Sequence, residues 1–379
     1  MLSHAKDAKH YILYVGTYTN GESKGIYAYR YDASTGSMQS LGLAAETQNP
    51  SFLVADAKGE HLFAVNELQK YQGESSGGVT SFTMDRKTGK LSELNEVASH
   101  GADPCYISLD RSGKYLLVAN YTGGNVAVIP ILPDGHLAEA SSVQKDEGTL
   151  GPDKERQESS HAHWIEASAR NRFVYVSDLG LDRVLIYKFD ATKGELSRDG
   201  SASRNSGSSA EKDFFSATLA PGTGPRHVAF SADGRFMYVL GELDATVTVF
   251  ANDDKETYRS IQKISGLPTG FSGKNTAAEI AIHPSGKFLY TSNRGDDSIA
   301  AFSIDHATGK LKFIGTVSTV GKTPRHFAID PTGTRLLVAS QDSNMIVEYQ
   351  IDENYGTLQL MRQVPNVPSP VCLVFVPTD

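Results

Sequence analysis

The chain of 379 residues has only two cysteines, Cys105 and Cys372, and no apolar run long enough to cross a bilayer. Two cysteines cannot build a disulfide framework, and both lie in apolar, strand-like runs, so we expect buried thiols. The N-terminus, MLSHAKDAKH, lacks the apolar stretch of a secretory signal. These absences predict a cytoplasmic protein without a membrane partner, although an exported chain recorded after signal removal would read the same way.

Basic residues are also fewer than acidic ones. Lys and Arg number 36 against 44 Asp and Glu, which gives a net charge of −8 and excludes the basic surface of a nucleic-acid-binding protein. The sequence contains neither a phosphate-cradling P-loop nor a dinucleotide fingerprint, so we expect no cofactor. His161 and His163 could bind a metal, but no further His/Cys cluster supports this, and we expect none. The sequence does not determine the oligomeric state; a monomer is favoured.

A repeat of about 50 residues organises the chain. An anchor, usually proline, begins an apolar run; a glycine follows nine residues after it in most copies, and a second apolar run comes next. The residues three and five positions after each anchor are apolar, which is the alternation of a strand with one face in a core. The seven anchors are Pro50, Pro104, Ala162, Pro225, Ala277, Pro324 and Pro370.

Units of about four strands at this period predict an all-β, seven-bladed β-propeller. The last anchor is followed by one strand only, and the N-terminal runs YILYVGTY and GIYAYRY supply strands that this blade lacks. Interlocked N- and C-terminal strands would close the ring and remove an exposed sheet edge. No helical periodicity persists between the strands, which argues against an α/β fold.

We therefore predict a single domain over residues 1–379. Residues 1–10 are expected to form a loose N-terminal segment, and the Ser/Gly-rich residues 197–213 a flexible insertion. A second insertion, residues 144–160, enters the third repeat and could overhang the mouth of the propeller.

Two positions in each blade should converge at one rim of the ring. The start of a hairpin's first strand and the end of its second lie together, away from the turn. The residue after the anchor and the residue eight after the glycine occupy these places. Polar members cluster in adjacent blades: His163, Arg226, Glu242, Arg294 and Arg325. Cations combined with one carboxylate and one imidazole can bind an anion and move a proton, although an ion pair between Arg226 and Glu242 could also be purely structural.

The same residues carry a resemblance to the seven-bladed propeller lactonases, which include bacterial 6-phosphogluconolactonases and a fungal carboxymuconate-cyclising enzyme. The resemblance covers nearly the whole chain and is most specific in VSDLGLDRV (176–184) and in SNRGDDSI (292–299). RQESSHAH (156–163) and GTGPRH (222–227) also match. By motif, the resemblance implies catalytic roles for His163, Arg226, Glu242 and Arg294. We expect substrate contacts from Arg325, His161, Glu67, Asn120, Tyr121 and Gln157.

The main hypothesis is hydrolysis of a sugar lactone such as 6-phosphogluconolactone. Either Glu242 or neutral His163 would activate water, Arg226 would stabilise the oxyanion, and Arg294 with Arg325 would bind the anionic small-molecule substrate. One alternative is cycloisomerisation of a muconate-type diacid at the same site. Another is a non-enzymatic propeller scaffold that binds a peptide.

Overall fold

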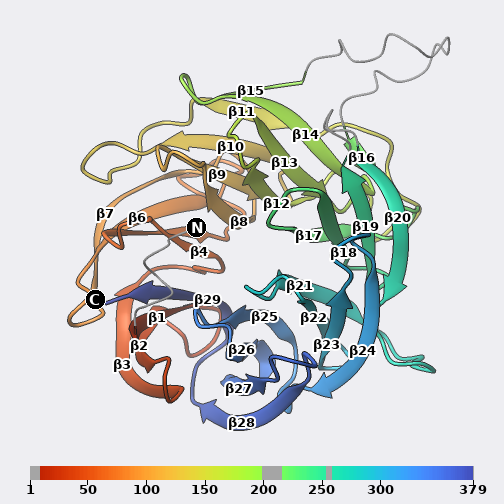
Figure 1. Cartoon of the computed structure of the whole chain (residues 1–379). Helices are drawn as coiled ribbons and strands as arrows, with labels where there is room; N and C mark the ends of the chain where they lie inside the picture. The colour runs from red at the N-terminus through yellow and green to blue at the C-terminus, as the bar shows by residue number, and fades with distance from the viewer. Residues whose placement is uncertain (1–8, 199–215, 253–257, 379) are drawn as a thin grey trace, which may run out of the picture.

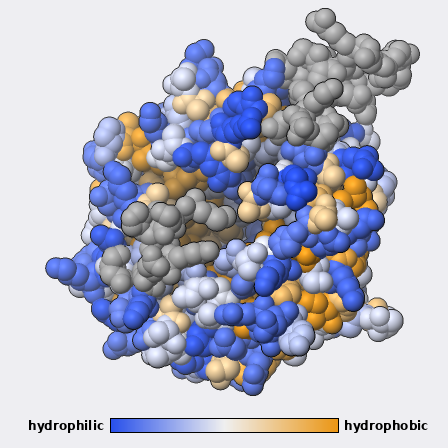
Figure 2. All heavy atoms as spheres, viewed as in Figure 1, coloured by the Kyte–Doolittle hydropathy of each residue, from blue (hydrophilic) through white to orange (hydrophobic). Residues whose placement is uncertain are grey.

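The structure is a computed structural model that describes residues 9–198, 216–252 and 258–378. Its strands form seven antiparallel sheets arranged as blades around a central channel, so the predicted seven-bladed β-propeller is confirmed (Figure 1). Apart from the short 3-10 turn η2 (Gln341–Ser343), no helix occurs in these ranges, and none there could span a membrane. Polar residues cover most of the face in Figure 2, which is hollowed at the centre of the ring.

We number the blades by their anchors. The first blade contains β4 (Leu53–Ala55), β5 (His61–Asn66), β6 (Gly78–Met84) and β7 (Leu91–Ala98). The second contains β8 (Pro104–Leu109), β9 (Tyr115–Asn120), β10 (Asn125–Pro130) and β11 (Ser142–Lys145). The third contains β12 (Ala162–Ala167), β13 (Phe173–Asp178), β14 (Arg183–Asp190), β15 (Glu195–Ser197) and β16 (Ser216–Thr218), of which both β15 and β16 pair with β14.

The next three blades are regular four-stranded sheets. The fourth contains β17 (Pro225–Phe230), β18 (Phe236–Gly241), β19 (Thr246–Asn252) and β20 (Tyr258–Ser265). The fifth contains β21 (Thr276–Ile282), β22 (Phe288–Arg294), β23 (Ser298–Ile304) and β24 (Leu311–Ser318). The sixth contains β25 (Pro324–Ile329), β26 (Arg335–Ser340), β27 (Met345–Ile351) and β28 (Leu358–Pro365).

The seventh blade joins the two ends of the chain, as the sequence predicts. Its innermost strand is β29 (Pro370–Pro377), followed outward by β1 (His10–Thr17), β2 (Gly25–Asp32) and β3 (Ser37–Glu46). In Figure 1 the blue β29 lies beside the red β1, and the two pair antiparallel over seven residue pairs from Tyr11↔Pro377 to Thr17↔Pro370. This pairing covers an edge that each terminal segment would otherwise expose.

Apolar side chains pack between the blades rather than in one central core. Each of the seven clusters of buried residues draws on two neighbouring blades; one joins Trp164 of the third blade to Val228 and Met237 of the fourth. Alternating residues of a strand therefore bury both faces of each sheet against neighbouring sheets. Cys105 and Cys372 are both buried free thiols, as expected.

The glycine of the repeat lies in the turn between the first two strands of a blade. Gly234, for example, donates its N–H to the carbonyl of Ser231 and has a φ of 71°, where glycine has no steric penalty. In the third blade Asn171 takes this place with a φ of 56°, and asparagine tolerates that conformation better than most residues. The weakest copy of the motif thus keeps the same turn geometry.

The structure describes only one of the segments that the sequence predicts to be loose or inserted. Most of residues 1–10 and 197–213 lies outside the described residues; His10 already belongs to β1 and Ser197 to β15. The insertion at 144–160 is described, and it begins in β11. Its later part reaches the rim of the channel through Arg156, which contacts the carboxylate of Glu242.

Candidate active site

Glu242 directly follows β18 and lies among three arginines. Its Oε2 is 3.0 Å from Arg226 Nε and 3.1 Å from Arg294 Nη2, and its Oε1 accepts a hydrogen bond from Arg156 Nη2 at 2.5 Å. The residue is only 3% exposed. Burial raises the pKa of this carboxyl, but the guanidiniums of Arg294, Arg226 and Arg156 outweigh it and hold the pKa at about 2. Glu242 is therefore an anion at neutral pH and a weak base.

His163 begins the third blade and faces the same carboxylate. Its Nε2 is 4.0 Å from Glu242 Oε2, and its Nδ1 is 3.7 Å from the thiol of Cys105. Burial, reinforced by the charge of Arg226, lowers the pKa of this imidazole well below its usual value. His163 is therefore neutral near pH 7 and can accept a proton. A gap of 4.0 Å is also one that a water molecule can bridge.

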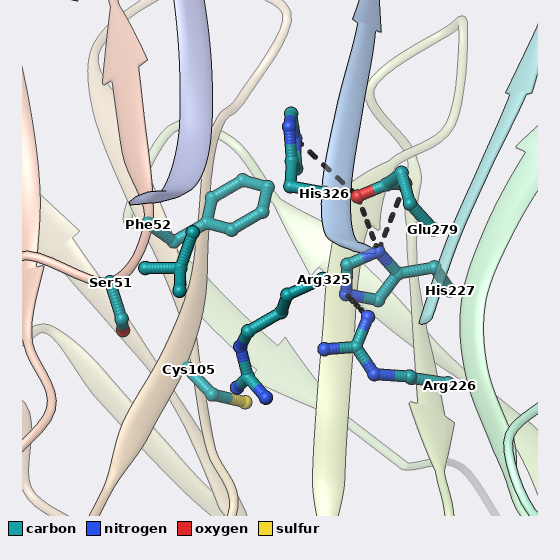
Figure 3. Close-up of a pocket in the computed structure, with 9 residues that line it drawn as sticks. Ser51, Phe52, Cys105, Arg226, His227, Glu279, Arg325 and His326 are labelled. Atoms are coloured by element: carbon teal, nitrogen blue, oxygen red, sulfur yellow. Dashed lines mark hydrogen bonds and ion pairs between the residues drawn. The ribbon is translucent and has the colours of Figure 1, made fainter. Parts of the chain in front are cut away.

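Arg226 extends from the start of β17 between this cluster and the channel. Its Nη1 donates to the carbonyl of Ala278 and lies 3.3 Å from His227 Nε2, while its Nε faces Glu242. Burial and the neighbouring charges of Arg294 and Arg325 lower its pKa to about 10, so it stays charged at neutral pH. Figure 3 shows its other terminal nitrogen directed toward Arg325.

Arg226 also lines a small pocket. Arg226 and Arg325 belong to its wall, together with Ser51 and Cys105, while His227, Glu279 and His326 line another side (Figure 3). His227 Nδ1 is 3.1 Å from both carboxylate oxygens of Glu279, and His326 Nε2 is 3.4 Å from Glu279 Oε2. A continuous polar chain therefore runs from Glu279 through His227 and Arg226 to Glu242.

Irregular strand starts explain why neighbouring residues face the same pocket. Successive side chains of a regular strand point to opposite faces. At the start of β17 the pairing with β18 shifts register between Pro225 and Val228, and β25 shifts between Pro324 and His326. Such irregularities redirect side chains, so that the arginine and the histidine of both Pro-Arg-His motifs reach the pocket.

Glu67 reaches the site through an intermediate residue. Both of its carboxylate oxygens lie 2.9 Å from the Tyr18 hydroxyl, which donates to them. The Tyr18 ring in turn lies 5.2 Å from the guanidinium carbon of Arg325. Glu67 thus holds the aromatic surface against which Arg325 packs.

Tyr121 and His161 form one side of the rim. Their rings stack with centroids 4.4 Å apart, and the Tyr121 ring meets the His163 ring edge-on at 5.4 Å. The Tyr121 hydroxyl accepts a hydrogen bond from Arg156 at 3.2 Å. His161 is held by Glu158, whose Oε1 is 3.0 Å from its Nε2. Tyr121 therefore joins His163 to the arginine cluster through Arg156, whereas His161 supports the Tyr121 ring from behind.

The side-chain amides of Asn120 and Gln157 form hydrogen bonds with backbone atoms in the described part of the chain. Asn120 Nδ2 donates to the carbonyl of Ser99 at 2.9 Å, and Gln157 Nε2 donates to the carbonyl of Leu179 at 2.8 Å. Gln157 Oε1 also accepts from the N–H of Asp153. These contacts fix the loops on either side of the rim, and among the described contacts none joins either amide to Glu242 or the pocket.

Sequence reasoning missed Arg156, His227, Glu279, His326 and the position of Cys105 beside His163. The signal for the two histidines was present, because each follows the arginine of a Pro-Arg-His motif. Glu279 occupies the equivalent place two residues after the anchor Ala277. Arg156 has no register in the repeat because it lies in an insertion, and its one signal was its place at the start of the family-matching stretch RQESSHAH (156–163).

One group of potential metal ligands occurs in the described part of the chain, and it lies away from this site. Asp56, Glu60 and His61 surround the turn between β4 and β5, at the opposite end of that hairpin from the rim. Asp56 Oδ2 is 2.8 Å from His61 Nδ1, so two of the three potential ligands already pair with each other.

Comparisons with known proteins agree with this architecture. A family model described as "Lactonase, 7-bladed beta-propeller" matches residues 12–375. The chain is 34% identical over 367 residues to a 6-phosphogluconolactonase of Bacillus subtilis, covering 97% of this chain and 98% of that protein. It is 33% identical over 320 residues to a 6-phosphogluconolactonase of Formosa agariphila, covering 83% and 85%. The solved structure of a periplasmic gluconolactonase of Pseudomonas aeruginosa superposes with a TM-score of 0.87 at 36% identity, covering 98% of this chain and all of that one (100%).

Proposed function

The chain belongs to the family of seven-bladed β-propeller lactonases, and on this premise we propose that its rim hydrolyses a sugar lactone with neutral His163 as the general base. The relatives named 6-phosphogluconolactonase and gluconolactonase support a sugar lactone as the substrate class. The contact that carries the mechanism is the one between His163 Nε2 and Glu242 Oε2, 4.0 Å apart within a ring of arginines.

In this mechanism a water molecule lies between His163 and Glu242 and attacks the lactone carbonyl carbon. The water proton passes to His163 Nε2, and the ionised Glu242 stabilises the resulting imidazolium. Collapse of the tetrahedral intermediate breaks the bond to the ring oxygen, which receives the proton back from His163. The products are a hydroxyl and a carboxylic acid on one open chain; the acid then ionises by releasing its proton to solvent, and His163 is back in its neutral form.

Glu242 is the poorer candidate for the base. A carboxyl whose pKa is held at about 2 by its arginine neighbours has little affinity for a proton at neutral pH. Its proposed role is instead to order Arg226, Arg294 and Arg156 around the substrate and to balance the imidazolium charge. Of the two residues that the sequence leaves open, we therefore propose His163 as the base.

The arginines have separate proposed roles. Arg226 stabilises the oxyanion, because one of its terminal nitrogens is directed into the pocket while its other nitrogens are held by Glu242, His227 and Ala278. Arg294 already donates to the carbonyl of Ala277 and contacts Glu242. We therefore assign it to the general positive field of the site, together with Arg156 at the rim.

The place of the reaction in the cell stays a prediction. The N-terminal sequence predicts the cytoplasm, whereas the similar Pseudomonas aeruginosa protein is a periplasmic gluconolactonase. Comparing 6-phosphogluconolactone with gluconolactone as substrates would show which setting the site suits.

The test is acid release from both lactones at constant pH, corrected for spontaneous hydrolysis. His163→Gln should lower kcat by about 10²–10⁴-fold, the usual contribution of a general base. His306→Gln, at an exposed position in the turn between β23 and β24, is the matched control and should retain wild-type turnover. A folded His163→Gln variant with wild-type kcat would remove His163 from the mechanism. Turnover of a muconate-type diacid without lactone hydrolysis would favour the cycloisomerase alternative.

A further inference from the structure

Arg325 differs from the other arginines of the site because its guanidinium has no acceptor. Among the described residues it forms no ion pair and no side-chain hydrogen bond, and its guanidinium packs against the ring of Tyr18. Arg226, Arg294 and Arg156 are all held by Glu242. Arg325 and Arg226 nevertheless line the same pocket, where two like charges repel each other unless an anion lies between them.

A second observation points to a ligand at the same wall. Ser51 is only 3% exposed, and its Oγ has no hydrogen-bond partner although it lines the pocket. A buried hydroxyl without a partner costs free energy that a bound acceptor would recover. Ser51 and Arg325 together offer an oxyanion several donors, and in the described part of the chain neither is hydrogen-bonded or ion-paired with a carboxylate.

Another side of the pocket offers acceptors instead. His326 is 8% exposed, and its Nδ1 is buried without a partner while its Nε2 faces Glu279. A histidine that donates from Nε2 to a carboxylate has a free lone pair on Nδ1. A ligand hydroxyl is the complementary group for that nitrogen. Figure 3 shows His326 and Glu279 well apart from Ser51 and Cys105 around the pocket.

We propose that this pocket is a subsite for the hydroxy-acid end of the substrate and product, with the carboxylate oxygens bound by Arg325, Arg226 and Ser51 and the neighbouring hydroxyl bound by His326. The proposal rests on the proposed function, because opening an aldonolactone creates a carboxylate next to a hydroxyl-bearing carbon. It assigns Arg325 to the reacting end of the sugar rather than to a distant phosphate. A muconate-type diacid has no hydroxyl to offer His326, so the subsite also favours a sugar acid over that substrate.

The experiment measures binding of glycolate, acetate and inorganic phosphate by calorimetry, and their competitive inhibition of lactone hydrolysis. Glycolate carries both groups, acetate lacks the hydroxyl, and phosphate tests whether the subsite takes a substituent phosphate instead. Glycolate should bind about two- to tenfold more tightly than acetate, the contribution of one neutral hydrogen bond. Phosphate that binds more tightly than glycolate, and does so through Arg325, would overturn the hydroxy-acid assignment.

Two single-residue variants test which side chains bind glycolate. Arg325→Gln should weaken glycolate by about 10–100-fold through loss of charge-assisted hydrogen bonds. Ser51→Ala removes a single hydroxyl and should weaken it by about two- to tenfold, which keeps the test open if Arg325→Gln does not fold. Arg259→Gln, on the exposed outer strand β20, is the matched control and should bind glycolate as the wild type does. Unchanged glycolate affinity in folded Arg325→Gln and in Ser51→Ala would overturn the proposal.

Binding and turnover separate the two proposals. A protein that hydrolyses a lactone but binds neither glycolate nor acetate retains the proposed function and loses the subsite. A protein that binds glycolate through Arg325 and hydrolyses no lactone retains the subsite and loses the proposed function.

Discussion

In six of the seven blades the residues two positions after the anchors form two contrasting halves, and Cys372 holds this position in the seventh blade. In the first three blades they are aromatic: Phe52, Tyr106 and Trp164. In the next three they are His227, Glu279 and His326. The Phe52 and Tyr106 rings lie 4.1 Å apart and Tyr106 and Trp164 6.1 Å apart, whereas the other half is joined by contacts of 3.1 Å and 3.4 Å to one carboxylate. The same place in the same repeat therefore holds two different chemistries.

The contrast shows that the fold requires this position to be filled but does not require it to be polar. The aromatic half gains stability from buried apolar surface. The polar half desolvates two imidazoles and a carboxylate, which is unfavourable unless their hydrogen bonds compensate for it. We infer that function retains the polar half, because it supports Arg226 and lines the pocket.

The largest expected effect is on stability in the aromatic half. Trp164 is 1% exposed, and Trp164→Ala should lower the free energy of unfolding by about 3–5 kcal/mol through the cavity it leaves. Urea unfolding would measure this loss. Leu132→Ala, at a position 44% exposed, is the control and should change the value by less than about 0.5 kcal/mol. A Trp164→Ala loss as small as that of the control would show that this half does not carry the packing.

Acid should destabilise the protein through the polar half. Burial, with the charges of His227 and Arg226, lowers the pKa of His326 from 6.5 to about 4 despite Glu279. Between these values the unfolded chain binds a proton that the folded chain does not, so stability falls as pH drops, by about 3 kcal/mol at pH 4 from this residue. Glu242, whose pKa is lowered from 4.5 to about 2, adds a second loss as pH falls through that lower window.

Urea unfolding at several pH values between 7.5 and 4 would measure the acid effect. His326→Phe places an aromatic ring in the polar half, as in the other half, and should reduce the slope between pH 6.5 and 4. His306→Gln, at an exposed position, should leave the slope unchanged. A flat dependence in the wild type would contradict the assignment of a buried, neutral His326.

The smallest expected effect comes from Glu279→Gln, which keeps the shape of the polar half and removes its charge. Burial raises the pKa of this carboxyl against the influence of His326 and Arg226, so at neutral pH its ionised form is destabilising. The variant should be as stable as the wild type or more so. If Glu279 positions Arg226 through His227, kcat of the variant should fall by about tenfold, which corresponds to an activation free energy higher by about 1.4 kcal/mol.

Two readouts distinguish positioning from simple structural support. In Glu279→Gln the acid limb of the pH–rate profile should stay where His163 sets it, and kcat should change more than KM. Glu93→Gln, on the exposed face of β7, is the matched control and should leave both unchanged. A large loss of stability in Glu279→Gln with unchanged kcat would show that the residue serves the fold instead.

Much of the fold could be predicted because the repeat consists of short sequence patterns that each specify a local backbone conformation. The anchor prolines, the alternating apolar residues and the turn glycine each follow from backbone geometry within about ten residues. Pro225, Gly234 and the strands around them lie where the pattern puts them. The rim positions followed from hairpin geometry, and Arg226, Glu242 and Arg294 do meet there.

The sequence alone thus determined the blades, their number, the closure by the two ends of the chain and the gathering of charged residues at one rim. Only the tertiary structure decided which neighbours complete the site. The register shift at Pro225 turns His227 inward beside Arg226, and a loop outside the repeat brings Arg156 to Glu242. Local patterns fix strands because backbone preferences act over a few residues. An irregular strand start or a long loop takes its conformation from contacts with distant parts of the chain. The periodicity of the sequence does not predict those contacts.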